Sequence, residues 1–367
     1  MFLILFCFYI TILLFFCIGT INFTNKRTIR SKIPGISVIV AIRNGGDSTN
    51  NIITYLKNQS YEDFVEFILV DDESTDNTRK FIEDAANHDS RFKYVSSIDG
   101  NPLLTHKKKA LDAGIKKSSY NHLLFTDVDC FIPSTWISIM AEYYTKGYNY
   151  LVGNSIVAPN NNFNFISSFQ RIDFLLLMII CRASSYFGSP WASTGQNQGF
   201  TKDLYTHSGG FIKINHFIGD DTAFLQLCKK HGAKSCFIDH REACIQSRNE
   251  FNLKSFLSQR IRWVSDGNKL WRINIYFFAV LVLCFLFYLS IPFTLFYSLI
   301  SYKIIGLLLG IKILIEFSLL YLGTKKLFIS NFIIDFIIWQ ILHIPYICIV
   351  GVLSYFPQFF HWRERKL

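Results

Sequence analysis

The feature that most constrains this chain is that its uncharged apolar segments are gathered at the two ends. Met1–Asn25 contains no charged residue, and neither does Ile273–Tyr302. A run of about 20 apolar residues is long enough to cross the hydrocarbon core of a bilayer. The whole sequence is 50% hydrophobic, with 37 Phe, and these end segments hold the excess. We therefore expect membrane helices at both ends and a water-exposed domain between them.

Met1–Asn25 is predicted to be an uncleaved membrane anchor. A cleaved signal peptide would need a basic start and a small-residue cleavage site, and this segment has neither. The residues that follow directly include Lys26, Arg27, Arg30 and Lys32. Basic residues beside a membrane helix mark its cytoplasmic side, so the domain that follows is expected in the cytoplasm.

Two kinds of partner are not expected. The net charge of +10 is explained by basic residues next to membrane helices, which attract anionic membrane lipid. The sequence shows no basic stripe interleaved with exposed aromatic residues, which argues against nucleic acid. Zinc is disfavoured because the nine cysteines form no C-x-x-C pair. One further group fits no familiar zinc spacing and is interpreted as buried thiols and surface histidines: Cys228, His231, Cys236, His240 and Cys244.

The middle of the chain alternates short apolar runs with helical patterns. The strand candidates are Ile36–Ile42, Phe64–Val70, Arg91–Ser96 and Leu123–Phe125. Helical patterns separate these runs, over about 47–56, 75–86 and 107–114. Alternation of strand and helix in short units is typical of an α/β fold, in which helices cover both faces of a parallel sheet.

Three of these strands end in polar residues, namely Arg43 and Asn44, Asp71 and Asp72, and Asp127 and Asp129. The carboxyl ends of parallel strands meet in one crevice, where α/β sheets bind ligands. Two carboxylates there are costly unless a cation neutralises them, and a hard divalent metal that bridges a diphosphate does so well. The simpler alternative for the D-x-D is an aspartate pair that caps a surface turn. The sequence contains no G-x-G-x-x-G and no P-loop, which disfavours a Rossmann dehydrogenase or a kinase-like ATPase.

Two further charged groups stand at the starts of helices. Lys107–Lys109 open a helix, where lysines are either a solvated helix start or a contact for substrate phosphates. Asp220 and Asp221 follow Gly219 directly before the helix Thr222–His231. An acid in that position is usually the helix cap, which accounts for only one of the two.

Pro159–Ser185 has an apolar face at helical spacing. Gln170, Arg171 and Asp173 interrupt it, so an interfacial or core helix is preferred to a membrane span.

Gln259, Arg262 and Trp263 stand at positions i, i+3 and i+4, so they share one face of a helix. The indole offers a flat apolar surface for a sugar ring, and Arg262 can pair with a phosphate or an acid. The alternative is an amphipathic helix on the membrane surface with its tryptophan at the interface, and both interpretations can hold at once.

Taken in order, the motifs IRN, LVDDESTD, HKKKAL, FTDVDC, GDD and QRIRW resemble those of the inverting family 2 glycosyltransferases, which have a GT-A fold. The resemblance covers Ile36–Trp263, and the flanking apolar segments are similar to those of the bacterial membrane-bound branch. It implies a Rossmann-like mixed sheet that binds a nucleotide-sugar donor, together with a glycan or lipid-linked acceptor. It also implies a multi-pass protein of the inner (cytoplasmic) membrane whose catalytic domain faces the cytoplasm.

The same resemblance implies roles for individual residues. The donor-binding candidates are Arg43, Asp71, Asp72, Lys108 and Asp127. Asp127 and Asp129 of the D-x-D are expected to bind Mn2+ or Mg2+ against the diphosphate, and Asp221 is expected to be the general base. The candidates on the acceptor and diphosphate side are Asn197, Asp220, Gln259, Arg262 and Trp263. One departure is Gly45, where many relatives have a glutamate after the R-N pair.

These expectations divide the chain into an anchor at 1–25, a cytoplasmic domain at 33–250, an amphipathic helix at 251–272 and a membrane region at 273–362. Within the last, Ile273–Tyr302 and Ile304–Leu322 are expected to cross the membrane out and back, with Lys312 and Glu316 paired on one helix face. Leu327–Phe356 either crosses once or forms a re-entrant or surface-lying segment.

Two other functions remain open at this level. A polysaccharide synthase that extends and extrudes one chain shares the Q-x-x-R-W motif, but such synthases usually have more membrane helices than the three or four counted here. A non-catalytic membrane scaffold or transporter with a degenerate transferase domain is the alternative from a different class. The apolar segments contain too few polar residues for an obvious transport path.

Overall fold

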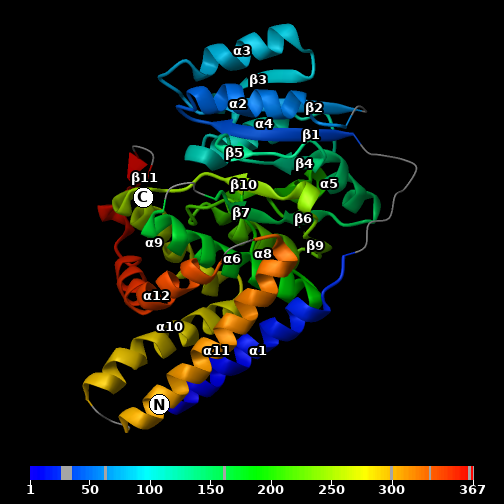
Figure 1. The fold of residues 1–367 in the computed structure, drawn as a ribbon. Coiled ribbons are helices and arrows are strands. Elements are labelled where there is room, and N and C mark those ends of the chain that lie inside the picture. Colours follow the sequence, from blue (N-terminus) through cyan, green and yellow to red (C-terminus); the bar gives the residue numbers. More distant parts are fainter. Residues whose placement is uncertain are drawn as a thin grey trace. The chain divides into compact units, whose positions relative to one another are not determined.

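The computed structural model describes residues 1–25, 35–61, 64–159, 163–297, 301–329, 332–362 and 365–366 (Figure 1). The chain forms two compact units. The sheet unit comprises Thr24–Ile156 and Ser189–Arg248, and the helical unit comprises Met1–Phe23, Val157–Gly188 and Asn249–Leu367. The basic residues expected on the cytoplasmic side of the first helix lie outside the described residues.

A seven-stranded mixed sheet forms the centre of the sheet unit, with strand order β3-β2-β1-β4-β8-β6-β9. The strands are β1 (Ile36–Ile42), β2 (Val65–Asp71), β3 (Phe92–Ser96), β4 (His122–Phe125), β6 (Tyr150–Gly153), β8 (Gln198–Thr201) and β9 (Ser235–Ile238). The four strands predicted from the sequence are adjacent and parallel. Only β8 runs against both its neighbours, β4 and β6. The predicted α/β fold class is confirmed.

Helices cover both faces of this sheet because its central strands are apolar on both sides. The helices of the sheet unit are α2 (Asp47–Lys57), α3 (Thr78–His88), α4 (His106–Lys117), α5 (Trp136–Thr145), α7 (Lys202–His207) and α8 (Thr222–Lys230). On one face, Ile52 of α2 and Trp136 of α5 join Val38 and Val40 in one buried cluster. On the other, α4 comes so close that a Cβ at Gly114 would lie 2.5 Å from Ile39.

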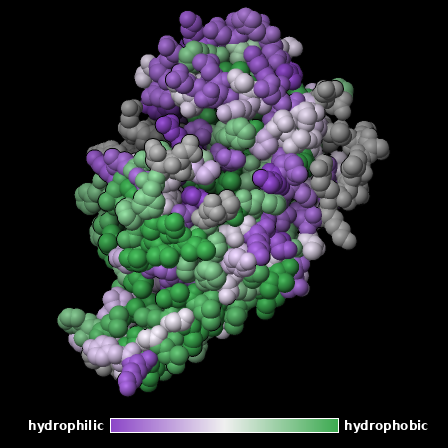
Figure 2. Space-filling view, viewed as in Figure 1, coloured by the Kyte–Doolittle hydropathy of each residue, from purple (hydrophilic) through white to green (hydrophobic). Residues whose placement is uncertain are grey.

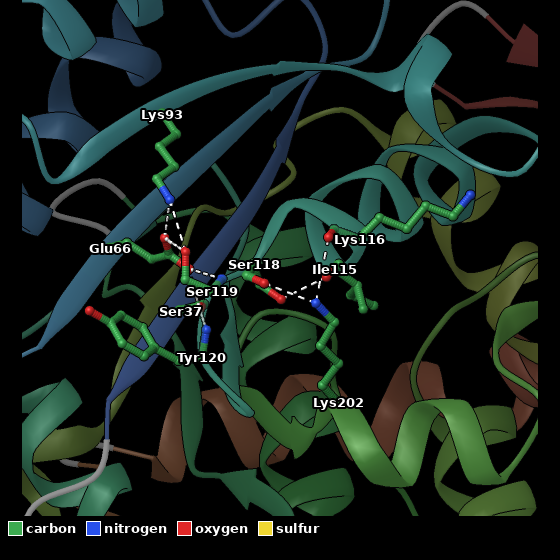
Figure 3. A network of polar contacts seen from close by, with 9 residues as sticks. All are labelled: Ser37, Glu66, Lys93, Ile115, Lys116, Ser118, Ser119, Tyr120 and Lys202. Atoms are coloured by element: carbon green, nitrogen blue, oxygen red, sulfur yellow. Dashed lines mark hydrogen bonds and ion pairs between the residues drawn. The ribbon is translucent and has the colours of Figure 1, made fainter.

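A polar network ties together the amino-terminal ends of β1, β2 and β3 (Figure 3). Glu66 of β2 accepts hydrogen bonds from Ser37 Oγ at 2.5 Å and from Lys93 Nζ at 2.5 Å. It also accepts from the backbone N–H of Ser119 at 2.5 Å and from its hydroxyl at 3.0 Å. Burial raises the pKa of Glu66, but these donors together hold it below its usual value. The end of the sheet opposite the polar strand termini is therefore fixed by one saturated carboxylate.

Among its described residues, the helical unit contains four helices that are long and apolar enough to cross a membrane. They are α1 (Phe2–Asn22), α10 (Ile275–Phe296), α11 (Tyr302–Leu327) and α12 (Ile333–Leu353). Figure 2 shows hydrophobic residues gathered over α10 and α11. The last predicted apolar region, which the sequence left open, forms the single helix α12.

A fifth helix, α6 (Phe165–Tyr186), is packed against α1, α11 and α12. The charged residues that interrupt its apolar pattern are paired inside this unit. Arg171 contacts Asp335 of α12 at 3.1 Å, and Asp173 contacts Arg260 of α9 (Leu253–Gly267) at 2.8 Å. Arg182 donates to the carbonyls of Thr20 and Phe23, at the carboxyl end of α1. That position is favourable because the carbonyls at a helix end lack partners and carry partial negative charge.

One carboxylate joins the four candidate membrane helices. Glu316 of α11 accepts hydrogen bonds from Tyr9 of α1 at 2.6 Å and from Tyr288 of α10 at 2.9 Å. Its other oxygen accepts from Lys312 at 2.8 Å and from Gln340 of α12 at 2.5 Å. The pairing of Lys312 with Glu316 that the sequence predicts is therefore present, and it lies within a larger buried network.

Candidate active site

The polar strand ends emerge at one edge of the sheet. β1 lies between β2 and β4, with Ile42 opposite Asp71 and Ile36 opposite His122. β8 runs the other way, so its first residue, Gln198, lies opposite Phe125 at the end of β4. The loops after β1, β2 and β4 and the segment that enters β8 therefore meet at the carboxyl edge of the parallel strands, as expected for an α/β binding site.

The loops after β1 and β2 hold each other through side chains. The Asn44 backbone N–H donates to Ser74 Oγ at 3.0 Å, and Asn44 Oδ1 accepts from the Thr75 N–H at 2.8 Å. The Gly46 N–H donates to Asp76 Oδ2 at 2.9 Å. Burial raises the pKa of Asp76, but its hydrogen bonds outweigh this effect and lower the pKa below its usual value. These contacts explain why the polar residues of the two motifs occur together.

Asp71 and Asp72, at the end of β2, are each 6% exposed. Asp71 Oδ1 accepts from the Ser74 N–H at 3.1 Å. Arg43 donates to the carbonyls of Asp72 at 2.9 Å and Glu73 at 3.3 Å. The guanidinium of Arg43 thus supports the backbone of the loop that carries the two aspartates.

Strained backbone is concentrated around these loops. In the part of the chain that the structure describes, four residues other than glycine have positive φ, and three of them are Asn44 at 47°, Glu73 at 56° and His106 at 55°. Each lies in the loop after β1, the loop after β2 or the start of α4. Such conformations cost energy in side-chain-bearing residues and collect at functional sites.

Gly45 lies in a position with no room for a side chain. A Cβ there would lie 2.4 Å from Thr49 Oγ1 and 2.8 Å from Ile42 Cγ2. A larger side chain at this position would therefore require the loop to shift.

A lysine lies between the acidic motifs. The ammonium of Lys107 is 2.7 Å from Asp127 Oδ1 and 3.5 Å from Asp220 Oδ1. Burial lowers the pKa of Lys107, but Asp127, Asp220 and Asp221 outweigh burial and raise it above its usual value. We call Lys107, Asp127, Asp220 and Asp221 the lysine–acid cluster. It joins the D-x-D after β4 to the acid pair before α8.

The structure places the neighbouring lysine elsewhere. Lys108, chosen from the sequence as a donor contact, is 4% exposed. Its ammonium donates to the carbonyls of Ile214 and Asn215, each at 3.3 Å, and to that of Phe217. From the run Lys107–Lys109, the sequence analysis chose Lys108 rather than Lys107 as the donor contact, although a signal separates the two. Lys108 shares the buried helix face of Leu111 and Ile115, whereas Lys107 is turned away from that face by about 100°.

Gln198 is a residue that the sequence analysis did not name among the site candidates. Its Nε2 faces Asp220 Oδ2 at 3.4 Å, while its Oε1 accepts from Tyr150 OH at 2.9 Å and Ser193 Oγ at 3.1 Å. A carboxylate only accepts hydrogen bonds, so the amide nitrogen of Gln198 must face Asp220 and its oxygen must face the two hydroxyl groups. Gln198 therefore orients the carboxylate of Asp220.

Asp221 is the acid that caps α8. Its Oδ1 accepts from the Thr222 N–H at 2.6 Å, and its Oδ2 accepts from the Gly195 N–H at 3.1 Å. The carboxylate is therefore held by backbone donors on two segments. Gly195 also touches the rest of the cluster, because a Cβ there would lie 2.9 Å from Lys107 Nζ and 3.2 Å from Asp220 Oδ2.

Asn197, predicted on the acceptor side, is fully buried. Its Oδ1 accepts from Trp136 Nε1 at 2.9 Å, and its Nδ2 donates to the carbonyls of Asn154 at 2.7 Å and Ala243 at 3.1 Å. The structure thus gives this side chain partners within the protein, and it braces the segment that leads into β8.

The D-x-D suits a metal that completes its coordination with substrate. Asp127 and Asp129 are half-buried at the end of β4, and the side chain of Asp127 is 33% exposed. Within the described ranges, no group of three or more His, Cys, Asp or Glu residues forms a metal cage, and this applies to the Cys/His group at 228–244 as well. Mg2+ and similar hard ions are commonly held by one or two carboxylates together with substrate phosphates and water. The donor set present fits such an ion.

The Q-x-x-R-W residues belong to the helical unit. Gln259, Arg262 and Trp263 are half-buried on α9. Arg260, between them, is 3% exposed, and its guanidinium carbon lies 4.2 Å from the centre of the Trp263 ring. Since Asp173 neutralises Arg260, the indole rests on a paired cation.

Comparisons with known proteins bear on the family and the fold of this chain. Residues 37–212 match the family described as Glycosyl transferase family 2, and residues 133–352 match the one described as Glycosyl transferase family group 2. An uncharacterized glycosyltransferase of Haemophilus influenzae is 25% identical over 260 residues, which are 67% of this chain and 88% of that protein.

Two further similar proteins have names that state a substrate or a bound ligand. A GalNAc(5)-diNAcBac-PP-undecaprenol beta-1,3-glucosyltransferase of Campylobacter jejuni is 24% identical over 182 residues, 47% of this chain and 57% of that protein. The chain thus matches little more than half of that relative. A mannosyltransferase from Pyrobaculum calidifontis, solved with GDP-Man and Mn2+, has a TM-score of 0.61 at 15% identity and 95% coverage of both chains. At that identity, the likeness concerns the fold.

Proposed function

Because this chain belongs to the family 2 glycosyltransferases, we propose that it is a membrane-bound inverting enzyme. It moves a sugar from a nucleoside-diphosphate sugar to the hydroxyl of a glycan or lipid-linked acceptor. The observation that carries this proposal is the lysine–acid cluster, in which acids from two distant motifs converge on Lys107 at the carboxyl edge of the sheet. Asp71 and Asp72, buried at the same edge, are proposed to contact the base and ribose of the donor.

Asp221 is proposed as the general base. Inverting transfer needs a carboxylate to take the proton from the acceptor hydroxyl as that oxygen attacks the anomeric carbon. Hydrogen bonds from the backbone N–H groups of Thr222 and Gly195 fix the direction of the Asp221 carboxylate. Asp220 is engaged with Lys107 and Gln198 instead, so its proposed role is to hold the lysine.

Asp127 and Asp129 are proposed to hold a divalent ion, Mn2+ or Mg2+. When bound, such an ion neutralises the charge that develops on the departing nucleoside diphosphate. Lys107 is the protein's own cation at the same place, and we assign the diphosphate contact to it rather than to Lys108, whose ammonium is turned toward backbone carbonyls.

The acceptor is proposed to be membrane-associated. The chain has four helices that could span a membrane, and the Campylobacter relative is named for an undecaprenol-linked substrate. We place the protein in the inner membrane with its sheet unit in the cytoplasm. Gln259, Arg262 and Trp263 are proposed to contact the acceptor or the diphosphate.

The first test asks whether the protein binds and uses a nucleotide-sugar donor. The purified full chain should show a raised melting temperature with one of UDP-, GDP- or dTDP-sugars in the presence of Mn2+, because a ligand that binds the folded state stabilises it. Transfer of radiolabelled sugar to a lipid-extracted acceptor then measures activity, and the length of the product separates single addition from chain extension. No stabilisation by any donor, and no transfer, would contradict the proposal.

The second test asks whether Asp221 is the general base. Asp221→Asn should keep donor-induced stabilisation but lower the transfer rate by about 100-fold or more, since general-base catalysis contributes about 10²–10⁴-fold. The matched control is Asp203→Asn, an exposed acid in the first turn of α7. It should leave transfer unchanged. Normal turnover by Asp221→Asn would remove this residue from the base role.

A further inference from the structure

Lys107 occupies an oxygen that the proposed metal ion also needs. Its ammonium lies 2.7 Å from Asp127 Oδ1, the distance of a charge-assisted hydrogen bond. Asp127 is one of only two carboxylates in the D-x-D. A divalent ion bound to that carboxylate at about 2.0–2.6 Å would stand beside a positive ammonium group. The two cations would repel each other, so the metal has to compete with Lys107.

A second acid and a close backbone approach flank the Lys107 ammonium. Asp220, its second partner at 3.5 Å, is 5% exposed and is oriented by Gln198. On the other side stands Gly195, whose position leaves a Cβ only 2.9 Å from the ammonium nitrogen. Lys107 is therefore held by acids of both motifs.

A diphosphate changes this competition. Phosphate oxygens are strong acceptors for a lysine ammonium, which acts as a point charge. A donor that brings its diphosphate to the D-x-D offers Lys107 new partners and adds negative charge for the metal. The lysine can then leave Asp127 without losing a counter-charge, and the carboxylate becomes available.

We propose, on the premise of the proposed function, that Lys107 couples metal binding to diphosphate binding. In the free protein, its ammonium neutralises Asp127 and Asp220 and weakens the binding of a metal alone. Once the Lys107 ammonium contacts the diphosphate instead of Asp127, the metal ion and the diphosphate each bind more tightly in the presence of the other. Linkage requires this coupling to be reciprocal, so the metal strengthens diphosphate binding by the same factor.

Removing the lysine charge tests the coupling without measuring activity. Mn2+ binding to the purified full chain is followed by the loss of the free Mn2+ signal in electron paramagnetic resonance, without and with UDP, GDP or dTDP. Lys107→Gln should bind Mn2+ alone about tenfold more tightly than wild type, within the usual range of coupling between sites. In the same variant, the nucleotide should strengthen Mn2+ binding by a smaller factor than in wild type, because the diphosphate still adds negative charge but no longer removes a competing ammonium.

Two further variants make the result specific. Lys109→Gln removes the same charge two residues along α4 and should behave as wild type, which separates contact with Asp127 from general electrostatics. Lys107→Arg keeps the charge and should restore weak Mn2+ binding. Melting curves confirm that each variant is folded.

The outcomes separate this inference from its premise. Equal or weaker Mn2+ binding by Lys107→Gln, with nucleotide enhancement as large as in wild type, would overturn the coupling and leave the proposed function standing. Absence of Mn2+ binding in every protein, with and without each nucleotide, would overturn the coupling and the metal assignment together.

Discussion

Gly195 shows how tightly the lysine–acid cluster is assembled from single residues. Its N–H donates to Asp221, while its α-carbon faces Lys107 and Asp220. A residue without a side chain is therefore required at the point where the segment before β8 meets both acid motifs. Here the need for glycine comes from close approach rather than from the backbone angle.

Gly195→Ala is expected to spare the fold and impair transfer. The added methyl group would lie 2.9 Å from the Lys107 ammonium, the movable end of a long side chain, so the lysine can shift at little cost in stability. A displacement of about 1 Å at reacting groups can lower a rate by about 100-fold, which is the loss we expect in the transfer assay. Gly306→Ala is the control, since open space surrounds that glycine of α11. A fully active Gly195→Ala enzyme would show that the lysine position is unimportant.

Neighbouring residues mark the limit of what the sequence could predict about the site. The acids at the strand ends and before α8 were found because their motifs are local. The choice of Lys108 over Lys107, and of Asn197 over Gln198, depended on which way adjacent side chains point. Adjacent residues point in opposite directions along a strand and about 100° apart on a helix. The helical face was readable from Leu111 and Ile115, but the partners of Gln198 come from β6 and the loop before β8.

At the scale of elements, the two ends of the parallel strands carry different kinds of polar group. The carboxyl end of β4 and the turn before α8 hold acids against a lysine with solvent access. The amino ends of the strands are instead closed by Glu66 with four hydrogen bonds (Figure 3). The strands themselves were predictable because their apolar runs are buried on both faces.

Glu66→Gln is expected to destabilise the sheet unit at neutral pH and to matter less in acid. The folded-state pKa of Glu66 is lowered, so its contribution is complete above the unfolded value of about 4.3 and is lost as pH falls through the folded pKa. At pH 7, the variant should lose about 1–3 kcal/mol, as when a charged hydrogen-bond partner is removed. Apparent melting temperatures measured from pH 7 to 3 check this.

The control for Glu66 is an exposed ion pair. Glu83 pairs with Arg79 at 2.8 Å, but its side chain is 43% exposed. Glu83→Gln should change the melting temperature little at any pH, because exposed pairs contribute about 0–1 kcal/mol. A constant difference between Glu66→Gln and wild type across the pH range would contradict the role of the ionised carboxylate.

At the scale of the whole molecule, the two units bury polar groups by different rules. The sheet unit turns its acids toward a binding edge, whereas the helical unit saturates Glu316 with donors from every candidate membrane helix. In an apolar environment, each unsatisfied polar group is costly, so such a network fixes which helices are neighbours and at what height. The sequence predicted the Lys312–Glu316 pair from spacing alone, but not its partners on three other helices.

Glu316→Leu is expected to be among the most damaging changes in the helical unit. It leaves Lys312, 2% exposed, without its counter-ion, and breaking a buried ion pair costs about 3–5 kcal/mol. Replacing both Lys312 and Glu316 by leucine should recover part of that loss, because no unpaired charge remains. Melting curves in detergent measure both effects, with Ser318→Ala on the exposed face of α11 as control. A double variant no better than Glu316→Leu would contradict this account.

The chain leaves the sheet unit after Ile156 to form α6 and returns at Ser189 before reaching β8, Asp220 and Asp221. A fragment cut to 33–250 for expression in water would therefore carry α6 without α1, α11 and α12, exposing an apolar surface in need of detergent. Replacing 157–188 by a short flexible bridge, rather than trimming the ends, is the step that should yield a soluble donor-binding core.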